Sequence, residues 1–283
     1  MNTLTLHQIS RQFGKKTALQ DVSCTLTPGI TALLGANGAG KSTLIHILST
    51  LLPESQGAVE WNGPDAGGEI RRLGNAYLRH LSVLFQSQPM FRSYTAEEYL
   101  TFCGSLRGLD RRQVVEQGQA LLQQFGLLDV YWKKIGAYSG GMRQRLALCG
   151  AFLGDPDILL LDEPSAGLDI YEREELKNYL CSLKKDRIIL ISTHIVPDVE
   201  NITDRVLLLH EGRLQAEGTQ AELIARLEGT VWELPAEAAV PESLPLYHSN
   251  GPRICFSPAA PCPQAVRKTP DLTDVYFQCI TGR

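Results

Sequence analysis

The sequence lacks the long hydrophobic run that would carry the chain across a membrane. No segment approaches the 18 or more apolar residues of a spanning helix, and the longest runs, such as residues 158–161 and 188–191, have the length of strands. The first residues also lack the basic start and the apolar core of a signal peptide. We therefore expect the chain by itself to be soluble.

An excess of basic residues and a regular cysteine pattern are also missing. The chain has 27 Lys and Arg residues against 31 Asp and Glu residues, which gives a net charge of −4. Nucleic acid is therefore not an expected partner, because a protein that binds a phosphate backbone usually has a basic excess or stripe. The seven cysteines form no paired Cys-x-x-Cys motif, so they indicate reduced thiols rather than a disulfide framework or a zinc site.

One segment, residues 35–43, has the spacing of a phosphate-binding loop. Its sequence is Gly-Ala-Asn-Gly-Ala-Gly-Lys-Ser-Thr, and apolar runs at 30–34 and 44–48 flank it. The order is therefore strand, glycine-rich turn and helix. The alternative is a glycine-rich turn with an accidental Lys-Ser pair. Because both flanking segments are those that phosphate binding requires, we prefer a nucleotide site.

The residue types in this loop explain how it would hold a polyphosphate. Glycines let the backbone curl so that successive N–H groups point inward. The helix that starts near Gly40 adds free N–H groups and the positive end of its dipole. Lys41 is placed to reach the β- and γ-phosphates, and Ser42 to hold Mg²⁺. The predicted phosphate-binding residues are Gly35, Asn37, Gly38, Gly40, Lys41, Ser42 and Thr43.

The N-terminal part alternates apolar and polar residues over 4–9 and 17–26, which predicts antiparallel strands with one covered face. A turn is predicted between them at 11–16, and it carries Phe13. The Phe13 ring is either an ordinary core residue or a flat surface on which an adenine ring stacks. Farther along, residues 65–68 are predicted to form a loop.

The pattern changes from strand to helix after residue 86. A buried strand over 81–85 ends at Gln86, and apolar residues then recur with helical spacing from Thr95 to about Phe125. A helical insertion of about fifty residues therefore separates Gln86 from Tyr138. It is too short to form a long coiled-coil arm.

A second glycine-containing segment follows this insertion. Ser139 is a good helix N-cap, and Gly140 and Gly141 expose the backbone at the start of a helix that runs towards Leu153. Two glycines in a helix cost up to about 1 kcal/mol each relative to alanine. Glycines at these two helix positions are explained if the phosphate of another molecule approaches this backbone closely.

Two further apolar runs end in polar residues that suit phosphate chemistry. Residues 158–161 lead into Asp162 and Glu163, and 188–193 lead into His194. Ligands bind at the carboxyl ends of buried parallel strands. Asp162 is therefore predicted to help order Mg²⁺, Glu163 to orient or deprotonate the attacking water, and His194 to donate to a γ-phosphate oxygen.

The composition shifts near the carboxyl end. Strands at 205–209 and 213–217 and a capped helix at 219–227 precede this shift, which lies at Gly229. Eight of the fifteen prolines follow Leu234, which excludes long helices there. Short strands at 231–232 and 254–256 and a last helix with Pro270 at its first position are predicted.

These motifs together resemble the ATP-binding subunit of an ABC transporter. They occur in that family's order and cover roughly residues 2–228. The resemblance implies an α/β fold: a RecA-like P-loop NTPase core, an N-terminal antiparallel β-subdomain and a helical subdomain at about 87–153. It divides the chain into a cassette at 1–228 and a small C-terminal accessory lobe at 229–283.

The resemblance also implies roles for individual residues. Phe13 takes the adenine-stacking position, where a tyrosine is usual, and Gln86 senses Mg²⁺ and the γ-phosphate. Glu163 is the general base and His194 clamps the γ-phosphate. Residues of a second subunit complete the site, so that one chain supplies half of each of two ATP sites in a head-to-tail homodimer. The residues implied in the second half-site are Ser139, Gly140, Gly141 and Asp169.

The family resemblance places the chain at the cytoplasmic face of a membrane, held by a separate permease. The family's signature commonly begins with Leu and ends with Gln, and here these residues are Tyr138 and Met142. The Tyr-Ser-Gly-Gly-Met form resembles subunits of drug and antimicrobial-peptide exporters, as do residues 192–196 and 269–276. An importer subunit is the alternative within the transporter class.

Two alternatives lie outside the transporter class. A soluble ABC ATPase acting on ribosomes or DNA is disfavoured by the single cassette, the short helical insertion and the absence of basic excess. A sensor that binds ATP without turnover is disfavoured because Glu163 and His194 are intact.

Overall fold

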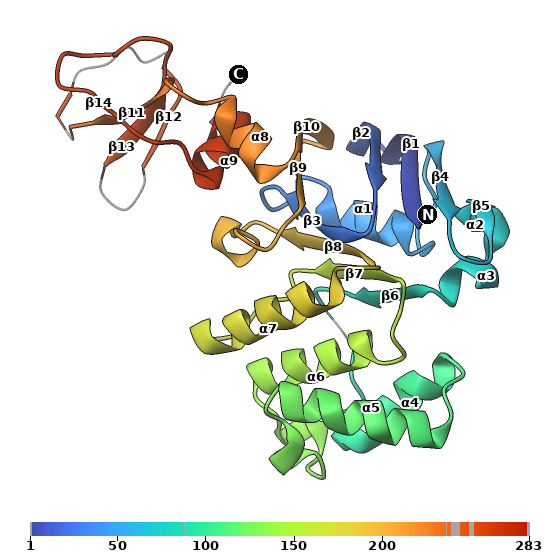
Figure 1. Ribbon diagram of the computed structural model, residues 1–283. Helices are drawn as coiled ribbons and strands as arrows, with labels where there is room; N and C mark the ends of the chain where they lie inside the picture. The colour runs from blue at the N-terminus through green and yellow to red at the C-terminus, as the bar shows by residue number, and fades with distance from the viewer. Residues whose placement is uncertain (1, 88, 236, 239–243, 249–251, 282–283) are drawn as a thin grey trace.

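A six-stranded sheet forms the centre of the molecule (Figure 1). The computed structural model describes residues 2–87, 89–235, 237–238, 244–248 and 252–281. The strand order is β10-β9-β3-β8-β7-β6, and the neighbours are parallel except for β10, which runs antiparallel to β9. The strands are β3 (Gly29–Leu34), β6 (Leu81–Leu84), β7 (Ile158–Asp162), β8 (Ile188–Thr193), β9 (Arg205–His210) and β10 (Arg213–Gly218).

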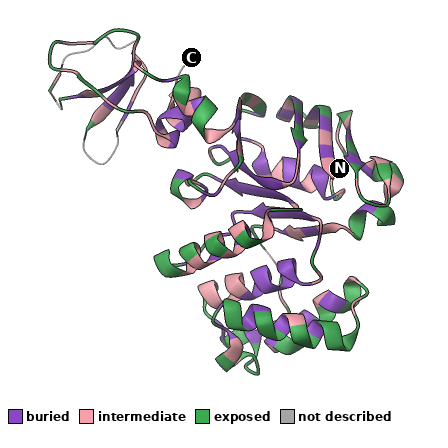
Figure 2. Cartoon of the chain, in the orientation of Figure 1, coloured by how far each residue is buried: buried purple, intermediate pink, exposed green. Residues whose placement is uncertain are grey.

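The continuous apolar runs are buried on both faces of this sheet, as expected for central parallel strands. Side chains alternate between the faces, so Leu159 and Leu161 enter one core while Ile158 and Leu160 enter another. Helices α6 (Gly140–Phe152) and α7 (Ile170–Leu183) pack on the first face. Helix α1 (Lys41–Leu48) lies on the second face, between the central sheet and the antiparallel sheet. Figure 2 shows the buried strands enclosed by helices whose outer faces are exposed.

The antiparallel sheet has the order β2-β1-β4-β5, and two of the predictions for it were wrong. The turn predicted at 11–16 is only two residues long, because the ladder continues to the pair Phe13–Lys16 and Gly14 adopts a φ of 57°. The loop predicted at 65–68 instead enters a short strand that pairs with the outer edge of β4. The strands are β1 (Thr3–Phe13), β2 (Lys16–Leu26), β4 (Gln56–Asn62) and β5 (Gly67–Glu69).

A helical segment covers residues 96–152 and includes the helices predicted between Gln86 and Tyr138. Capping boxes start two of its helices, because Thr95 pairs with Glu98 and Asp110 with Gln113. The short helices α2 (Ile70–Leu73) and α3 (Asn75–Leu78) precede it; they were not predicted, since four residues are too few to show a helical period. The segment contains α4 (Ala96–Leu106), α5 (Arg111–Gln124), η1 (Leu128–Val130), η2 (Ile135–Ala137) and α6.

The carboxyl-terminal part forms a small sheet and a helix that packs against α8 (Figure 1). The prediction that the last helix opens at Pro270 was wrong by two residues. Asp271 caps the helix instead, because its carboxylate accepts a hydrogen bond from the Asp274 backbone N–H at 3.0 Å. The elements are η3 (Val196–Asp198), α8 (Gln220–Ala225), β11 (Val231–Leu234), β12 (Leu246–His248), β13 (Arg253–Phe256), β14 (Val266–Arg267) and α9 (Leu272–Thr281).

Candidate functional site

A cavity opens at the carboxyl ends of β3, β6 and β7, where three of the predicted motifs meet. Its volume is about 340 Å³, which lies in the range of small-molecule sites. The segments after β3, β6 and β7 contribute to it, and so does the turn of the β1–β2 hairpin. The lining residues are Phe13, Lys16, Ala18, Asn37, Gly38, Gly40, Lys41, Ser42, Thr43, Gln86 and Glu163.

The loop between β3 and α1 needs glycine at two positions. A Cβ on Gly40 would lie 2.6 Å from the Ala18 carbonyl oxygen, and a Cβ on Gly35 would lie 2.4 Å from the Leu209 carbonyl oxygen. Gly40 also has a φ of 111°, a conformation that other residues avoid. The backbone therefore forms a tight cradle at the start of α1, with the free N–H groups that bind phosphate.

Lys41 is buried inside this cradle. Its Nζ donates hydrogen bonds to the carbonyl oxygens of Gly35 at 2.7 Å and Ala36 at 3.3 Å. It also lies 3.6 Å from the Glu163 Oε1 atom. Burial lowers the pKa of Lys41, and the nearby carboxylates of Glu163 and Asp162 oppose this shift. A cation with restricted solvation is thus held inside the loop that the sequence predicts to bind phosphate.

Glu163 is oriented by its backbone and by three side chains. Its φ is 50°, a left-handed conformation that is uncommon for a residue with a Cβ and that clusters at functional sites. The carboxylate contacts His194 Nδ1 at 2.9 Å and accepts from Thr193 Oγ1 at 3.3 Å, in addition to the ion pair with Lys41. The carboxylate is buried and points towards the phosphate cradle, where a base for a water molecule would be needed.

Asp162 lies one residue earlier, at the end of β7. It is buried and accepts a hydrogen bond from Ser192 Oγ on the neighbouring strand β8. Ser42 and Gln86 line the cavity, whereas Asp162 is not among its lining residues. Hydroxyl, amide and carboxylate oxygens are the ligands that Mg²⁺ prefers, so the donor types in this part of the site fit that ion.

The predicted residues of the other half-site do not line this cavity. The Ser139 Oγ atom accepts from the Met142 N–H at 3.1 Å and so caps α6, and the Asp169 carboxylate accepts from the Glu172 N–H at 2.9 Å and caps α7. Gly140 and Gly141 form the first turn of α6. The ion pair between Arg145 and Glu172, at 3.0 Å, ties the two helices together.

The structure also adds residues that the sequence analysis missed. Lys16 and Ala18 line the cavity, and Ser192 and Thr193 hold the two carboxylates. A signal for the last two was present, because they directly precede His194 at the end of an apolar strand. In the described part of the chain, no helix is long and apolar enough to cross a membrane.

Comparisons with known proteins identify the family. The family model described as ABC transporter matches residues 19–166. The ABC transporter ATP-binding protein NatA of Bacillus subtilis (strain 168) is 34% identical over 227 residues, which are 78% of this chain and 91% of that protein. The daunorubicin resistance ATP-binding protein DrrA3 of Streptomyces coeruleorubidus is 33% identical over 80% of this chain and 71% of its own.

A solved structure shows the same fold. The structure titled as the ATP-binding subunit of an ABC transporter superposes with a TM-score of 0.72 at 29% identity, covering 79% of this chain and 92% of its own. The predicted RecA-like P-loop fold is thereby confirmed, as is the predicted family. The chain belongs to the ABC transporter family and is one of its ATP-binding subunits, an ATPase coupled to transport.

Proposed function

We propose that this chain energises an exporter, as a homodimer held at the cytoplasmic face of a membrane by a separate permease. The arrangement of Glu163 between Lys41 and His194 carries the catalytic part of this proposal. The export direction is supported by the relative named for daunorubicin resistance and by the Tyr-Ser-Gly-Gly-Met signature at 138–142.

The cavity would take ATP with its base at the hairpin and its phosphates at α1. Phe13, whose side chain is 45% exposed, offers a ring face to the adenine. Ser42, Gln86 and Asp162 would hold Mg²⁺, which would neutralise charge on the phosphates when bound. The residues assigned to phosphate binding are Gly35, Asn37, Gly38, Gly40, Lys41, Ser42 and Thr43.

Hydrolysis of ATP requires a water molecule that is oriented towards the γ-phosphate. Glu163 would accept a proton from this water, and its contacts with Thr193 and His194 hold the carboxylate in place. His194 would contact the γ-phosphate with its exposed edge. Because Lys41 neutralises the site, the anionic Glu163 can lie close to a phosphate without excluding it.

A second copy would complete each site. Ser139, Gly140 and Gly141 lie at the exposed start of α6, where a helix N-terminus can meet the phosphates of ATP on the partner subunit. Asp169 would link the two sites across the interface. Closure of the dimer would then depend on the γ-phosphate, because only its presence brings both halves together.

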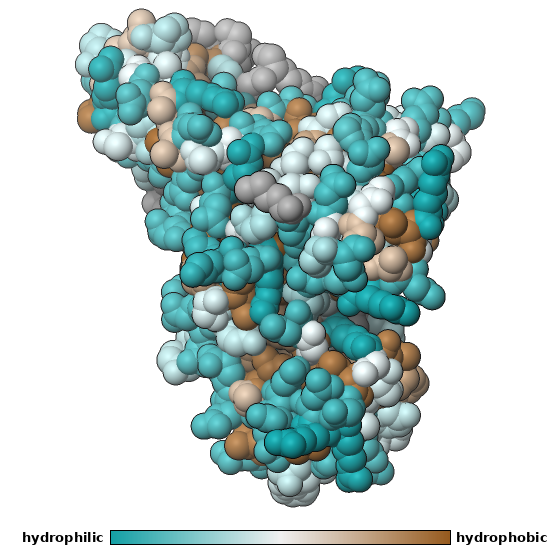
Figure 3. All heavy atoms as spheres, turned by 45° about the vertical axis from the view of Figure 1, so that its right-hand side comes forward, coloured by the Kyte–Doolittle hydropathy of each residue, from teal (hydrophilic) through white to brown (hydrophobic). Residues whose placement is uncertain are grey.

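The permease would dock beside the helical subdomain. A groove of about 470 Å³ runs between the segment after β6 and helix α4, with Phe91 51% exposed and Leu106 72% exposed along it. Figure 3 shows hydrophobic side chains gathered on this lower part of the molecule. We further assign residues 1–228 to the cassette and 229–283 to the accessory lobe.

Transport in inside-out vesicles tests this function. The chain would be purified with the membrane protein that accompanies it and reconstituted, and daunorubicin would serve as the probe. An exporter accumulates the probe inside the vesicles when ATP is added outside. ATP-driven loss of a preloaded probe would instead identify an importer, and recovery with ribosomes or DNA but no membrane protein would refute the transport assignment.

A further inference from the structure

Turn η3, two residues beyond His194, joins two parts of the proposed site. Its Asp198 side chain is only 8% exposed. One carboxylate oxygen accepts a hydrogen bond from Ser165 Oγ, and the other pairs with Arg173 Nη1 at 2.9 Å. Ser165 begins the segment that ends at Asp169, so a single carboxylate connects the His194 turn with the segment assigned to the dimer interface.

Helix α9 supports this turn from the carboxyl-terminal side. It contacts η3, β9 and α8. Leu272, Val275 and Tyr276 of α9 belong to the same buried core as Val196 and Val199, which lie in and just after η3. Burial raises the pKa of Tyr276, and the negative charge of Glu163 raises it further.

A buried polar cluster fixes α9 to the rest of the accessory lobe. Asp274 is fully buried and accepts hydrogen bonds from Tyr247 Oη at 2.6 Å, Lys268 Nζ at 2.5 Å and the Asp271 N–H at 2.8 Å. The Tyr247 ring, on β12, also stacks on Phe277 of α9 with 4.0 Å between ring centroids. A buried carboxylate needs such partners, so this cluster determines where α9 can lie.

We propose that the accessory lobe positions residues for ATP hydrolysis. Helix α9 packs against η3 and holds it in place, and Asp198 in η3 then fixes the positions of His194 and of the 165–169 segment. Asp198 is a positioning residue, since it acts through Ser165 and Arg173. This inference rests on the proposed roles of Glu163 and His194. It predicts that loosening the packing of α9 lowers turnover and leaves ATP affinity unchanged, because no residue of α9 is among those that line the cavity.

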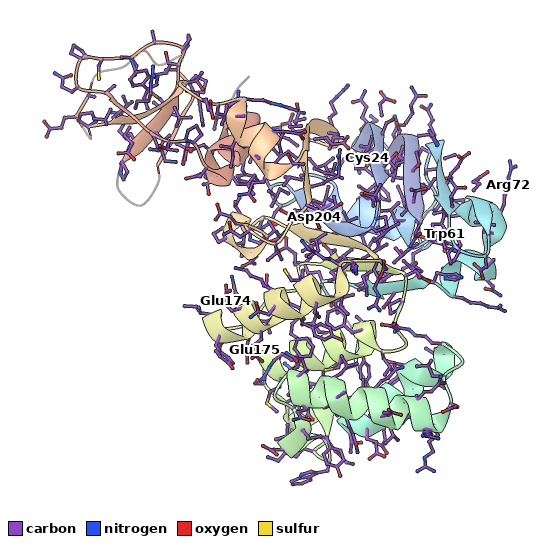
Figure 4. All side chains as sticks on the ribbon, in the orientation of Figure 1. Cys24, Trp61, Arg72, Glu174, Glu175 and Asp204 are labelled. Carbon is purple, nitrogen blue, oxygen red and sulfur yellow. The ribbon has the colours of Figure 1, made fainter. Side chains whose placement is uncertain are left out.

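The first experiment removes the charge of Asp198. In the full chain, Asp198→Asn should lower kcat five- to twentyfold while the ATP dissociation constant stays within twofold, and Asp198→Glu should recover part of the loss. The matched control is Glu174→Gln, which removes an exposed carboxylate of helix α7 that pairs with the largely buried Lys177; Glu174 points away from the body of the molecule (Figure 4). Wild-type kcat in Asp198→Asn would overturn the positioning role.

The second experiment loosens α9 from within the lobe. Tyr247→Phe removes one hydrogen bond to Asp274, and Asp274→Asn weakens the pair with Lys268. Hydrogen exchange should show faster exchange over 272–281, with kcat reduced and ATP affinity retained. Faster hydrogen exchange together with a wild-type kcat would overturn the proposal. Unchanged exchange in both variants would also overturn it, because the polar cluster would then not hold α9 in place.

Failure of the proposed function gives a different result from failure of this inference. If Glu163→Gln hydrolyses ATP at the wild-type rate, the assignment of the site is wrong whatever the Asp198 variants do. If Glu163→Gln is inactive and Asp198→Asn has the wild-type kcat, the assignment of the catalytic site is retained and the accessory lobe has no part in positioning its residues.

Discussion

Replacement of Glu163 by glutamine separates ATP binding from hydrolysis. Glutamine has nearly the size of glutamate, so it fits the buried position and can keep a polar contact with Thr193 or His194. It cannot accept a proton from water at neutral pH. We therefore expect Glu163→Gln to bind ATP and to lose nearly all turnover.

The expected magnitudes follow from the contacts of this carboxylate. A positioned general base contributes about 10²–10⁴-fold to rate, so kcat should fall by at least about 100-fold. This corresponds to about 3 kcal/mol in the activation free energy, at about 1.4 kcal/mol for each factor of ten. The attraction between Lys41 and Glu163 at 3.6 Å amounts to about 4–5 kcal/mol at an effective dielectric constant of about 20. Its loss frees Lys41 for phosphate, so ATP affinity should stay equal or rise.

Two assays on the purified chain check these expectations. Phosphate release gives kcat, and calorimetry with ATP and Mg²⁺ gives affinity, with Glu174→Gln as the charge-matched control on the exposed face of α7. Size-exclusion chromatography should show a dimer of Glu163→Gln in ATP and a monomer without it. Turnover within threefold of the wild type would refute the assignment of Glu163 as the base.

Three further predictions concern the same cavity. Lys41→Ala should weaken ATP binding about 10- to 100-fold, because it removes a hydrogen-bonded charge worth about 1.5–3 kcal/mol; normal affinity in calorimetry would count against the phosphate role. Phe13→Ala should weaken ATP binding by about 1–3 kcal/mol and leave tripolyphosphate binding unchanged, since only a base can stack on the ring; equal losses for both ligands would exclude stacking. Burial lowers the pKa of Lys41 below 10.5 in the folded chain, so the unfolded chain binds this proton more tightly, and the free energy of unfolding should rise with pH from the folded-state pKa up to 10.5. Denaturant unfolding at several pH values should show this rise in the wild type and not in Lys41→Met. The same pH dependence of the unfolding free energy in both proteins would contradict the prediction.

The sequence predicted those parts of the fold that depend on local pattern. The apolar runs before Asp162 and His194 could be placed as buried parallel strands, because a strand covered on both faces shows no polar alternation. The cap at Ser139 was also predicted, since it acts within its own first helical turn.

Features that depend on pairing between distant segments were missed. The turn after Phe13 was predicted too long, because its length depends on the register of β1 against β2. The glycine-rich sequence at 65–68 predicts a loop, but strand β5 begins there because β4 offers an edge for pairing. The start of α9 was placed at Pro270 rather than after Asp271, where the capping contact with Asp274 decides it.

The kind of chemistry could be predicted from the residues alone, because the phosphate loop, the acid pair after β7 and the glycine pair after Ser139 are local motifs whose residue types suit one kind of ligand. How these motifs meet could not be predicted in this way: Glu163 lies between Lys41 and His194, the start of α6 stays outside the cavity of its own chain, and α9 packs on η3. Burial and side-chain contacts across the sheet arise between residues far apart in the chain, and a pattern along the chain does not record them.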